Sequence, residues 1–475
     1  MDYEPVIGLE VHAQLCTDSK LFAPVSTTFG APPNSNTCEI CLGMPGVLPV
    51  LNQHAVDLAI RAALGLKCTV HERSQWSRKH YFYPDLSKGY QISQYDRPIA
   101  TEGELEIIVE GQKKTIHIER IHMEEDAGKN VHDDTITGGR SYVDFNRAGV
   151  PLIEIVTKPD IHSPEEASTY MKTLRQILRY LYVCDGNMEE GSLRCDANVS
   201  IKPIDQKELG TRTEIKNINS FRFVNQAIQY EIFRQTEVLN RGDKVIQETR
   251  LWDSQAKMTR SMRSKEDAHD YRYFPDPDLP DLVIEQRSIA EIRSKMPELP
   301  AEKQLRYVKQ LHLNDYDAQV LTESADVACF FENALKRHNN PKAIANWVIN
   351  DVLREIKDKS ISSLPFEGSD LGVLVNLIDD QIISGKIAKN VFEEMLKTGT
   401  SPEQIVREKD LRQVNDIDGI TTIIDEILKN NPGNIEKYKA GKTTLLGFFV
   451  GQVMKETKGK ANPKVVNDLL KQKLD

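Results

Sequence analysis

Alternating apolar and polar residues mark the first strand that the sequence predicts, over residues 6–15. The odd positions of this segment, from Ile7 to Leu15, are all apolar, and the positions between them hold glycine or polar residues. Because successive side chains of a β-strand point to opposite faces, the segment predicts a strand with one buried face. The other face carries Glu10 beside His12, which indicates either an ordinary solvated surface or part of a site.

Similar strand patterns recur as far as about residue 290. They are predicted over 105–111, 114–123, 151–158, 192–202 and 212–219. A helix is expected to begin at Ser163, where Pro164 and Glu166 complete a capping box. A second helix is expected from about Phe221 to near Gly242. Because the helices do not alternate regularly with the strands, the pattern predicts a mostly antiparallel α+β domain.

The pattern changes at residues 271–280, which favours a domain boundary there. In this segment, YRYFPDPDLP, three prolines favour a rigid, non-helical connector. From about Ser288 onward the apolar spacing is helical almost throughout, with a further break at 397–404. We therefore expect a sheet domain at 1–290, a helical domain at 291–402 and a small helical tail domain at 403–475.

Length, charge and cysteine content narrow the class of protein. A chain of 475 residues exceeds what one core usually organises, and no run approaches the roughly 18 apolar residues of a membrane helix. The N-terminus lacks the pattern of a signal peptide, and seven cysteines fit reduced thiols, so a cytoplasmic protein is expected. The net charge of -10 argues against general coating of nucleic acid. Residues 431–475 nevertheless hold nine lysines against four acidic residues and form a local basic module.

Acidic and basic side chains share the polar faces of several predicted strands. If these strands are neighbours, their polar faces bring together Glu10, His12, Glu124, Glu125, Asp196 and Glu214, with Arg194, Lys216 and Lys129 nearby. Asp126 follows Glu124 and Glu125 where the predicted strand gives way to a loop. Carboxylates on one face repel each other unless a cation lies between them. Oxygen ligands favour Mg²⁺, a single imidazole also admits Mn²⁺, and interleaved cations suit a phosphate-bearing substrate. For each strand taken alone, an ordinary solvated face is the alternative.

An aromatic and basic segment at residues 78–98 is a second candidate for substrate binding. It holds four tyrosines together with Arg78, Lys79 and Lys88, which suits base stacking and phosphate binding. A surface β-hairpin packed through its tyrosines is the alternative interpretation. The GKTT at 441–444 is not a P-loop, because Glu436 stands where that motif requires glycine. The sequence also lacks a serine-hydrolase motif such as G-x-S-x-G.

Two cysteines in a C-x-x-C arrangement, Cys38 and Cys41, offer a third candidate site. They would form a zinc knuckle if two further thiolates approached them. Cys16 and Cys68 are the nearest such cysteines along the chain, at irregular spacing. Reduced structural cysteines are the alternative.

Long segments in an unbroken order resemble the B-subunit family of the glutamyl-/aspartyl-tRNA amidotransferases, and they extend over essentially the whole chain. The matching segments are VIGLEVHAQL, PNSNTCEICLGMPGVLPVLN, RKHYFYPDLSKGYQISQYD, HMEEDAGK, NRAGVPLIEIVTKPD, MEEGSLRCDANVSI, EIKNINSF, DYRYFPDPDLP and GFFVGQVMKETKGKANPKVVNDLLKQKL.

The resemblance implies a fold and a function. It implies an antiparallel cradle domain, a helical domain and a tail that contacts tRNA, within a heterotrimer. The partners are an amidase-type glutaminase subunit and a small third subunit. The chain of this family uses ATP and Mg²⁺ to activate the side-chain carboxylate of misacylated Glu-tRNA(Gln) or Asp-tRNA(Asn), which ammonia from the glutaminase then amidates. Two alternatives are a non-catalytic tRNA-binding scaffold and a stand-alone ATP-grasp-like ligase, which the missing glycine-rich loop disfavours.

The resemblance also assigns residues by position. The metal-site motifs of the family match Glu10, His12, Glu124, Glu125, Asp196 and Glu214. We infer that Lys79, Arg194 and Lys216 stabilise the transferred phosphoryl group, and that Lys79, Lys88 and Arg194 bind the nucleotide.

One departure from the family concerns zinc. Many members carry a C-x-C shortly before the C-x-x-C, and here Ala23 and Val25 stand in its place. Half of the zinc ligands are therefore missing, and we expect less than stoichiometric zinc.

Overall fold

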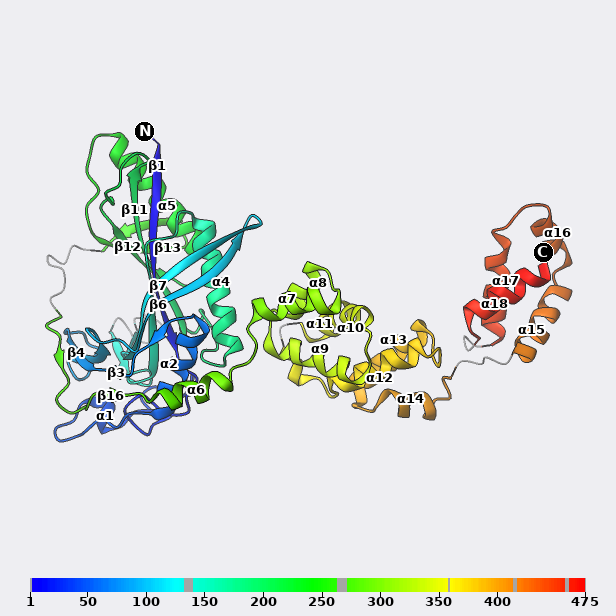
Figure 1. Cartoon of the computed structure of the whole chain (residues 1–475), viewed down its shortest axis with the longest axis horizontal. Helices are drawn as coiled ribbons and strands as arrows, with labels where there is room; N and C mark the ends of the chain where they lie inside the picture. The colour runs from blue at the N-terminus through cyan, green and yellow to red at the C-terminus, as the bar shows by residue number, and fades with distance from the viewer. Residues whose placement is uncertain are drawn as a thin grey trace. The chain divides into compact units, whose positions relative to one another are not determined.

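The chain divides into two compact units, Met1–Leu299 and Pro300–Asp475 (Figure 1). The computed structural model describes residues 2–131, 140–262, 271–357, 359–412, 417–457 and 461–474. The first unit combines a large sheet with helices and the second is helical, which confirms the predicted α+β class with an antiparallel-sheet cradle domain followed by helical regions. Among the described helices, none is both long and apolar enough to cross a membrane.

A single large sheet dominates the first unit. Within the described residues its strands are β1 (Tyr3–Gln14), β2 (Thr69–Val70), β6 (Ala100–Val109), β7 (Gln112–Glu125), β10 (Pro151–Thr157), β11 (Leu193–Pro203), β12 (Thr213–Ile218), β13 (Thr249–Asp253) and β14 (Met258–Ser261). Their spatial order is β14-β13-β12-β11-β1-β10-β7-β6-β2, and neighbours are antiparallel except β12 and β13. The strands predicted from alternation are confirmed as β1, β6, β7, β10, β11 and β12.

Shorter strands form separate sheets in the first unit. Three small sheets are present among the described residues: β4 (Trp76–His80) with β5 (Tyr90–Gln94) and β15 (Phe274–Pro275), β3 (Arg73–Ser74) with β16 (Leu282–Val283), and β8 (Lys129–Val131) with β9 (Tyr142–Asp144). The aromatic and basic segment therefore does form a β-hairpin, of β4 with β5. The connector at 271–280 is non-helical, as predicted, and pairs through β15 with β4.

Three helices pack against the apolar face of the sheet: α2 (Gln53–Gly65), α4 (Pro164–Tyr180) and α5 (Phe221–Asn240). Two shorter helices complete the described set, α1 (Glu39–Leu42) and α6 (Gln286–Ser294), of which α6 packs against α2. The apolar residues of β1 are buried in one core with residues of α2, α4 and α5, and Figure 1 shows α4 and α5 along the sheet. The opposite, polar face of β1 is therefore left for a site.

The predicted start of α4 is confirmed, with one difference in its hydrogen bonds. The Ser163 side chain accepts from the backbone N–H of Glu166, as a capping residue does. The Glu166 carboxylate, however, accepts from the backbone N–H of His162 and pairs with Lys114. The reciprocal bond of a capping box is thus displaced by one residue, from Ser163 to His162.

The described part of the second unit is helical and contains two separate apolar cores. Its elements are α7 (Pro300–Leu311), α8 (Asp315–Leu321), α9 (Ala325–Arg337), α10 (Pro341–Trp347), the π-helix η1 (Val348–Val352), α11 (Leu353–Ile356), the 3₁₀-helix η2 (Ile361–Ser363), α12 (Gly368–Asp379), α13 (Gly385–Thr398), α14 (Pro402–Glu408), α15 (Ile417–Lys429), α16 (Pro432–Lys439), α17 (Leu445–Glu456) and α18 (Pro463–Leu474). One core spans Tyr307 to Val406 and the other spans Ile420 to Leu474. The basic tail belongs to the latter, and its Lys458 and Lys460 lie outside the described residues.

Candidate active site on the polar face of the sheet

Cross-strand pairing brings residues that are far apart in the sequence onto one face. His12 on β1 lies opposite Glu154 on β10 and opposite Arg194 on β11. Glu10, two residues earlier on the same face, lies opposite Asp196 of β11. Directly paired residues in antiparallel strands have neighbouring side chains. The alternation that buries the apolar side of β1 therefore also positions its polar side for chemistry.

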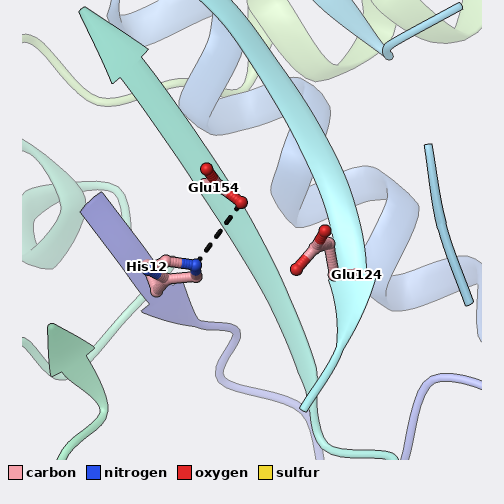
Figure 2. Close-up of side chains that lie close together, drawn as sticks. All are labelled: His12, Glu124 and Glu154. Atoms are coloured by element: carbon pink, nitrogen blue, oxygen red, sulfur yellow. Dashed lines mark ion pairs between the residues drawn. The ribbon is translucent and has the colours of Figure 1, made fainter. Parts of the chain in front are cut away.

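The first group of side chains consists of His12, Glu124 and Glu154. One nitrogen or oxygen of each lies within 4.8 Å of the others, and Figure 2 shows the three side chains pointing toward one another from β1, β7 and β10. The His12 Nε2 is 3.4 Å from the Glu154 Oε2. Among the described residues this is the one such group of histidine, cysteine and carboxylate side chains. Its donors, two carboxylates and an imidazole, suit a hard divalent cation such as Mg²⁺ or Mn²⁺.

His122 and Lys79 supply positive charge to the same group. The His122 Nε2 is 3.2 Å from both the Glu154 Oε2 and the Glu124 Oε1, and its buried Nδ1 has no hydrogen-bond partner among the described residues. The Lys79 Nζ is 3.8 Å from the Glu124 Oε1 and 5.0 Å from the centre of the Tyr271 ring. Two buried carboxylates are thus held between an ammonium and two imidazoles.

These contacts set the protonation states in the first group. Burial opposes ionisation of Glu124, but Lys79 and His122 lower the pKa of Glu124 to about 2. Burial also opposes the charged form of His122, yet Glu154 and Glu124 raise the pKa of His122 to about 9. The pKa of His12 is likewise raised, because Glu154 outweighs its desolvation. At neutral pH Glu124 and Glu154 are therefore ionised, and the protonated His122 imidazole lies beside both of them.

The second group consists of Glu10, Asp196 and Glu214, with Lys216 between two of them. The Lys216 Nζ is 3.1 Å from the Asp196 Oδ2 and 2.9 Å from the Glu214 Oε1. The Asn198 amide donates to the Glu10 Oε1 at 2.9 Å. Burial, followed by the charges of Glu154 and Glu214, raises the pKa of Glu10. The negative charge of Glu154, in the first group, therefore influences the protonation of Glu10, in the second group.

Three residues predicted for the site form ion pairs outside the two groups: Glu125, Lys88 and Arg194. Glu125 pairs with Lys88 and accepts from the backbone N–H of Ile92 at 2.9 Å, so it does not join the first group. The Arg194 Nη1 lies 2.7 Å from the Asp126 Oδ2. Burial opposes ionisation of Asp126, but Arg194 and Arg147 lower its pKa to about 2. Lys88 and Arg194 are therefore bound to carboxylates at the edge of the site.

Glu154 and His122 were missed by the sequence prediction. In PLIEIVT, Glu154 is the one charged residue of a fully buried strand, which is a signal that could have been used. His122 shares a face with Glu124 by simple alternation along β7. Glu154 lies in a segment dominated by apolar side chains, and His122 lies directly between the apolar Ile121 and Met123, so neither residue was predicted from the sequence.

The fold and the site define a class of protein: an α+β domain whose polar sheet face can hold divalent cations beside lysines, joined to helical regions. Residues 5–290 match the family model described as the GatB/GatE catalytic domain, and residues 329–474 match the one described as the GatB domain.

Curated relatives agree with these matches. The chain is 55% identical, over 99% of both chains, to the B subunit of aspartyl/glutamyl-tRNA(Asn/Gln) amidotransferase from Thermodesulfovibrio yellowstonii. It is 54% identical to the protein of the same name from Carboxydothermus hydrogenoformans and 56% identical to that from Geobacter sulfurreducens, in each case over 100% of this chain and at least 99% of the relative. The chain therefore belongs to the family of aspartyl/glutamyl-tRNA(Asn/Gln) amidotransferase B subunits.

Proposed function

We propose that this chain activates the side-chain carboxylate of misacylated Glu-tRNA(Gln), Asp-tRNA(Asn) or both by phosphorylation, so that ammonia can replace the phosphate and form the amide. Membership in the amidotransferase family supports the reaction. The observation that carries the proposal is the convergence of His12, Glu124 and Glu154 within 4.8 Å, beside Lys79. A carboxylate is a poor electrophile until it is phosphorylated, and phosphoryl transfer depends mostly on positioning and on cations.

The donor set of the first group fits Mg²⁺, and one ion would be held by His12, Glu124 and Glu154. The proposed ligands of a second ion, Glu10, Asp196 and Glu214, do not converge as closely, and that ion would have to displace the Lys216 ammonium from between Asp196 and Glu214. A bound Mg²⁺ neutralises charge on the phosphates of ATP and on the phosphoryl group in transfer. The low pKa of Glu124 keeps this carboxylate ionised and available as a ligand, and a cation would compete with the proton that Glu154 favours on His12.

Lysines are the proposed partners of the phosphoryl oxygens. Lys79 is anchored only loosely, at 3.8 Å from Glu124, and can turn toward a phosphate without breaking a short hydrogen bond. Lys216 is more exposed and is shared by two carboxylates. Arg194 and Lys88 already form ion pairs with Asp126 and Glu125. Their proposed role in nucleotide binding is therefore to add positive charge beside the site while these ion pairs hold them in place.

The rest of the complex follows from the family and is part of the same proposal. An amidase-type glutaminase subunit supplies ammonia, a small third subunit completes a heterotrimer, and the lysine-rich tail contacts tRNA in the cytoplasm. A non-catalytic tRNA-binding scaffold is the second candidate. The buried carboxylates disfavour it, because a face that carries Glu10, Glu154 and Glu214 repels a phosphate backbone unless cations bridge the two.

The test compares ATP consumption on Glu-tRNA by the wild-type complex and by the Glu10→Gln complex, with ammonium chloride as the nitrogen donor. Glutamine keeps the acceptor oxygen for Asn198 but removes a charged ligand. We expect turnover to fall by about 100-fold or more while tRNA binding survives, and ammonia should not rescue it because the lost step precedes amide formation. Glu119→Gln, an exposed position on β7, is the matched control. Near-normal turnover of Glu10→Gln would refute the proposal and favour the scaffold.

A further inference from the structure

Cys38 and Cys41 lie close enough to react with each other. Their sulfur atoms are 3.6 Å apart, Cys38 is half-buried and Cys41 is buried. Cys38 is the residue that precedes α1, and its backbone is extended there. A disulfide needs a sulfur separation of about 2.05 Å, so a shift of less than 2 Å would close the bond. The half-buried cysteine can be reached by reagents from solution, and the buried one lies directly behind it.

A buried lysine approaches the inner sulfur. Lys20 is 1% exposed, and its Nζ is 3.4 Å from the Cys41 Sγ. The same ammonium donates to the backbone carbonyls of Asn36 at 2.7 Å and Phe145 at 3.4 Å. Among the described residues, no carboxylate forms an ion pair with Lys20. A buried ammonium favours an anionic partner, and a thiolate at Cys41 would be that partner.

The surroundings of the two cysteines fit a metal ion poorly. Among the described residues, no histidine, carboxylate or third cysteine joins Cys38 and Cys41 in a group that could hold a metal. The backbone N–H of Lys20 donates to the carbonyl of Val25 at 3.0 Å, so the turn in which Ala23 and Val25 replace cysteines is the turn that carries the lysine. A structural zinc site takes four ligands, and an adjacent ammonium repels a cation.

We propose that Cys38 and Cys41 form a redox-active dithiol in which Cys38 reacts with a small disulfide, Cys41 closes the intramolecular bond, and Lys20 assists by stabilising the Cys41 thiolate. This reaction is separate from the activation of tRNA-bound carboxylates proposed above.

The reaction balances as ordinary thiol–disulfide exchange. The Cys38 thiolate attacks one sulfur of a low-molecular-weight disulfide such as oxidised glutathione, whose S–S bond breaks and releases one thiolate. Cys41 then loses its proton, and its sulfur attacks the Cys38 sulfur of the mixed disulfide and releases the second thiolate. Two protein thiols are oxidised and one disulfide is reduced to two thiols.

Lys20 acts in the second step. Burial raises the pKa of the Cys41 thiol, and the Lys20 ammonium opposes that rise. In the resting protein Cys41 is therefore a thiol, and the ammonium becomes important when the proton leaves. Lys20 is a positioning residue rather than a reacting group.

The dithiol also contacts the segment that bears Lys88. The Ser87 hydroxyl donates to the Cys41 carbonyl at 2.5 Å. Gly43, which ends α1 at a φ of 66°, lies so close to Lys88 that an added Cβ would be 2.7 Å from its Cγ. A disulfide at α1 would therefore form directly beside the Lys88–Glu125 pair.

The experiment exposes the full-length chain to glutathione buffers of increasing oxidised fraction and maps the cysteines by mass spectrometry. We expect an internal Cys38–Cys41 disulfide. In Cys41→Ser, a glutathione mixed disulfide should instead accumulate on Cys38, because the resolving thiol is gone. Lys20→Met should slow closure by about tenfold, because the Cys41 thiolate loses the ammonium that stabilises it. Cys16→Ser, at a cysteine outside the pair, is the control and should leave closure unchanged.

Two results would overturn the proposal. One is modification of the exposed Cys16 and Cys329 under conditions in which Cys38 and Cys41 stay reduced. The other is elemental analysis that finds one zinc per chain which is lost in Cys38→Ser. If Lys20→Met does not fold, trapping of the mixed disulfide in Cys41→Ser still decides whether the pair is reactive.

Discussion

The substitution Glu154→Gln should show how much the negative charge of Glu154, as distinct from its packing, contributes to the stability of the first group. Glu154 is the central residue of the group, since its Oε2 lies 3.4 Å from His12 and 3.2 Å from His122. Its pKa is held well below the usual range, because the two imidazoles outweigh the cost of burial. Glutamine has nearly the same shape and keeps one acceptor, so the variant removes charge rather than volume. Both imidazoles lose the carboxylate that contributes most to raising their pKa values.

The size of the effect follows from those contacts. Breaking a buried ion pair costs about 3–5 kcal/mol when the partner stays charged, but an imidazole can lose its proton. We therefore expect the free energy of unfolding to fall by about 1–3 kcal/mol at pH 6. Because the folded pKa of His122 is about 9 and its usual value is 6.5, this stabilisation is fully present below pH 6.5 and is lost as the pH rises through 9. The difference in the free energy of unfolding between wild type and variant should therefore shrink as the pH rises from 6.5 through 9.

The assay is denaturant unfolding of chelator-treated protein, followed by tryptophan fluorescence at pH 6 and pH 9. The three tryptophans are Trp76 and Trp252 in the first unit and Trp347 in the second, so a Trp347→Phe background reports on the first unit alone. Glu119→Gln in the same background is the control. A stability difference that is absent at pH 6, or that grows toward pH 9, would refute the reasoning.

Three further predictions test other parts of the account. The purified single chain should not amidate Glu-tRNA with glutamine as donor, because its sequence has no glutaminase nucleophile, and robust activity in that assay would contradict this. Deleting residues 403–475 should raise the tRNA KM and weaken its salt dependence, and an unchanged tRNA affinity would show that the tail does not bind tRNA. Lys303 and Arg306 overcome burial and lower the pKa of Glu332 from its usual value of 4.5, so Glu332→Gln should destabilise the helical unit by about 1–2 kcal/mol at pH 7. That difference should be fully present above pH 4.5 and should disappear as the pH falls further, and a loss that is independent of pH would contradict it.

Local patterns in the sequence were sufficient to predict the main elements of the first unit. The alternation at Ile7–Leu15 predicted the buried face of β1, and Ser163 and Phe221 marked the starts of α4 and α5. Each of these features depends on residues only a few positions apart in the sequence, so the sequence alone is sufficient to predict it.

The composition of the site was only partly predictable, because it depends on register between distant segments. His12 meets Glu154 across two strands that are more than 140 residues apart, and no pattern within either strand specifies that pairing. The partners of the cations were hidden for a similar reason. Asp126, which directly follows β7, reaches Arg194 of β11 only after the sheet has formed, because β1 and β10 lie between these two strands. Glu125 reaches Lys88 only after β5 has packed against β7.

The central claim is that the tRNA-bound carboxylate itself accepts a phosphoryl group from ATP. The direct measurement uses Glu-tRNA whose side-chain carboxylate carries a heavy oxygen isotope, with ATP, Mg²⁺ and ammonium chloride, and analyses the inorganic phosphate by mass spectrometry. If the carboxylate is phosphorylated, the bond to the labelled oxygen breaks when ammonia enters, and one labelled oxygen should appear in each phosphate released. Formation of the amide with unlabelled phosphate would contradict the account.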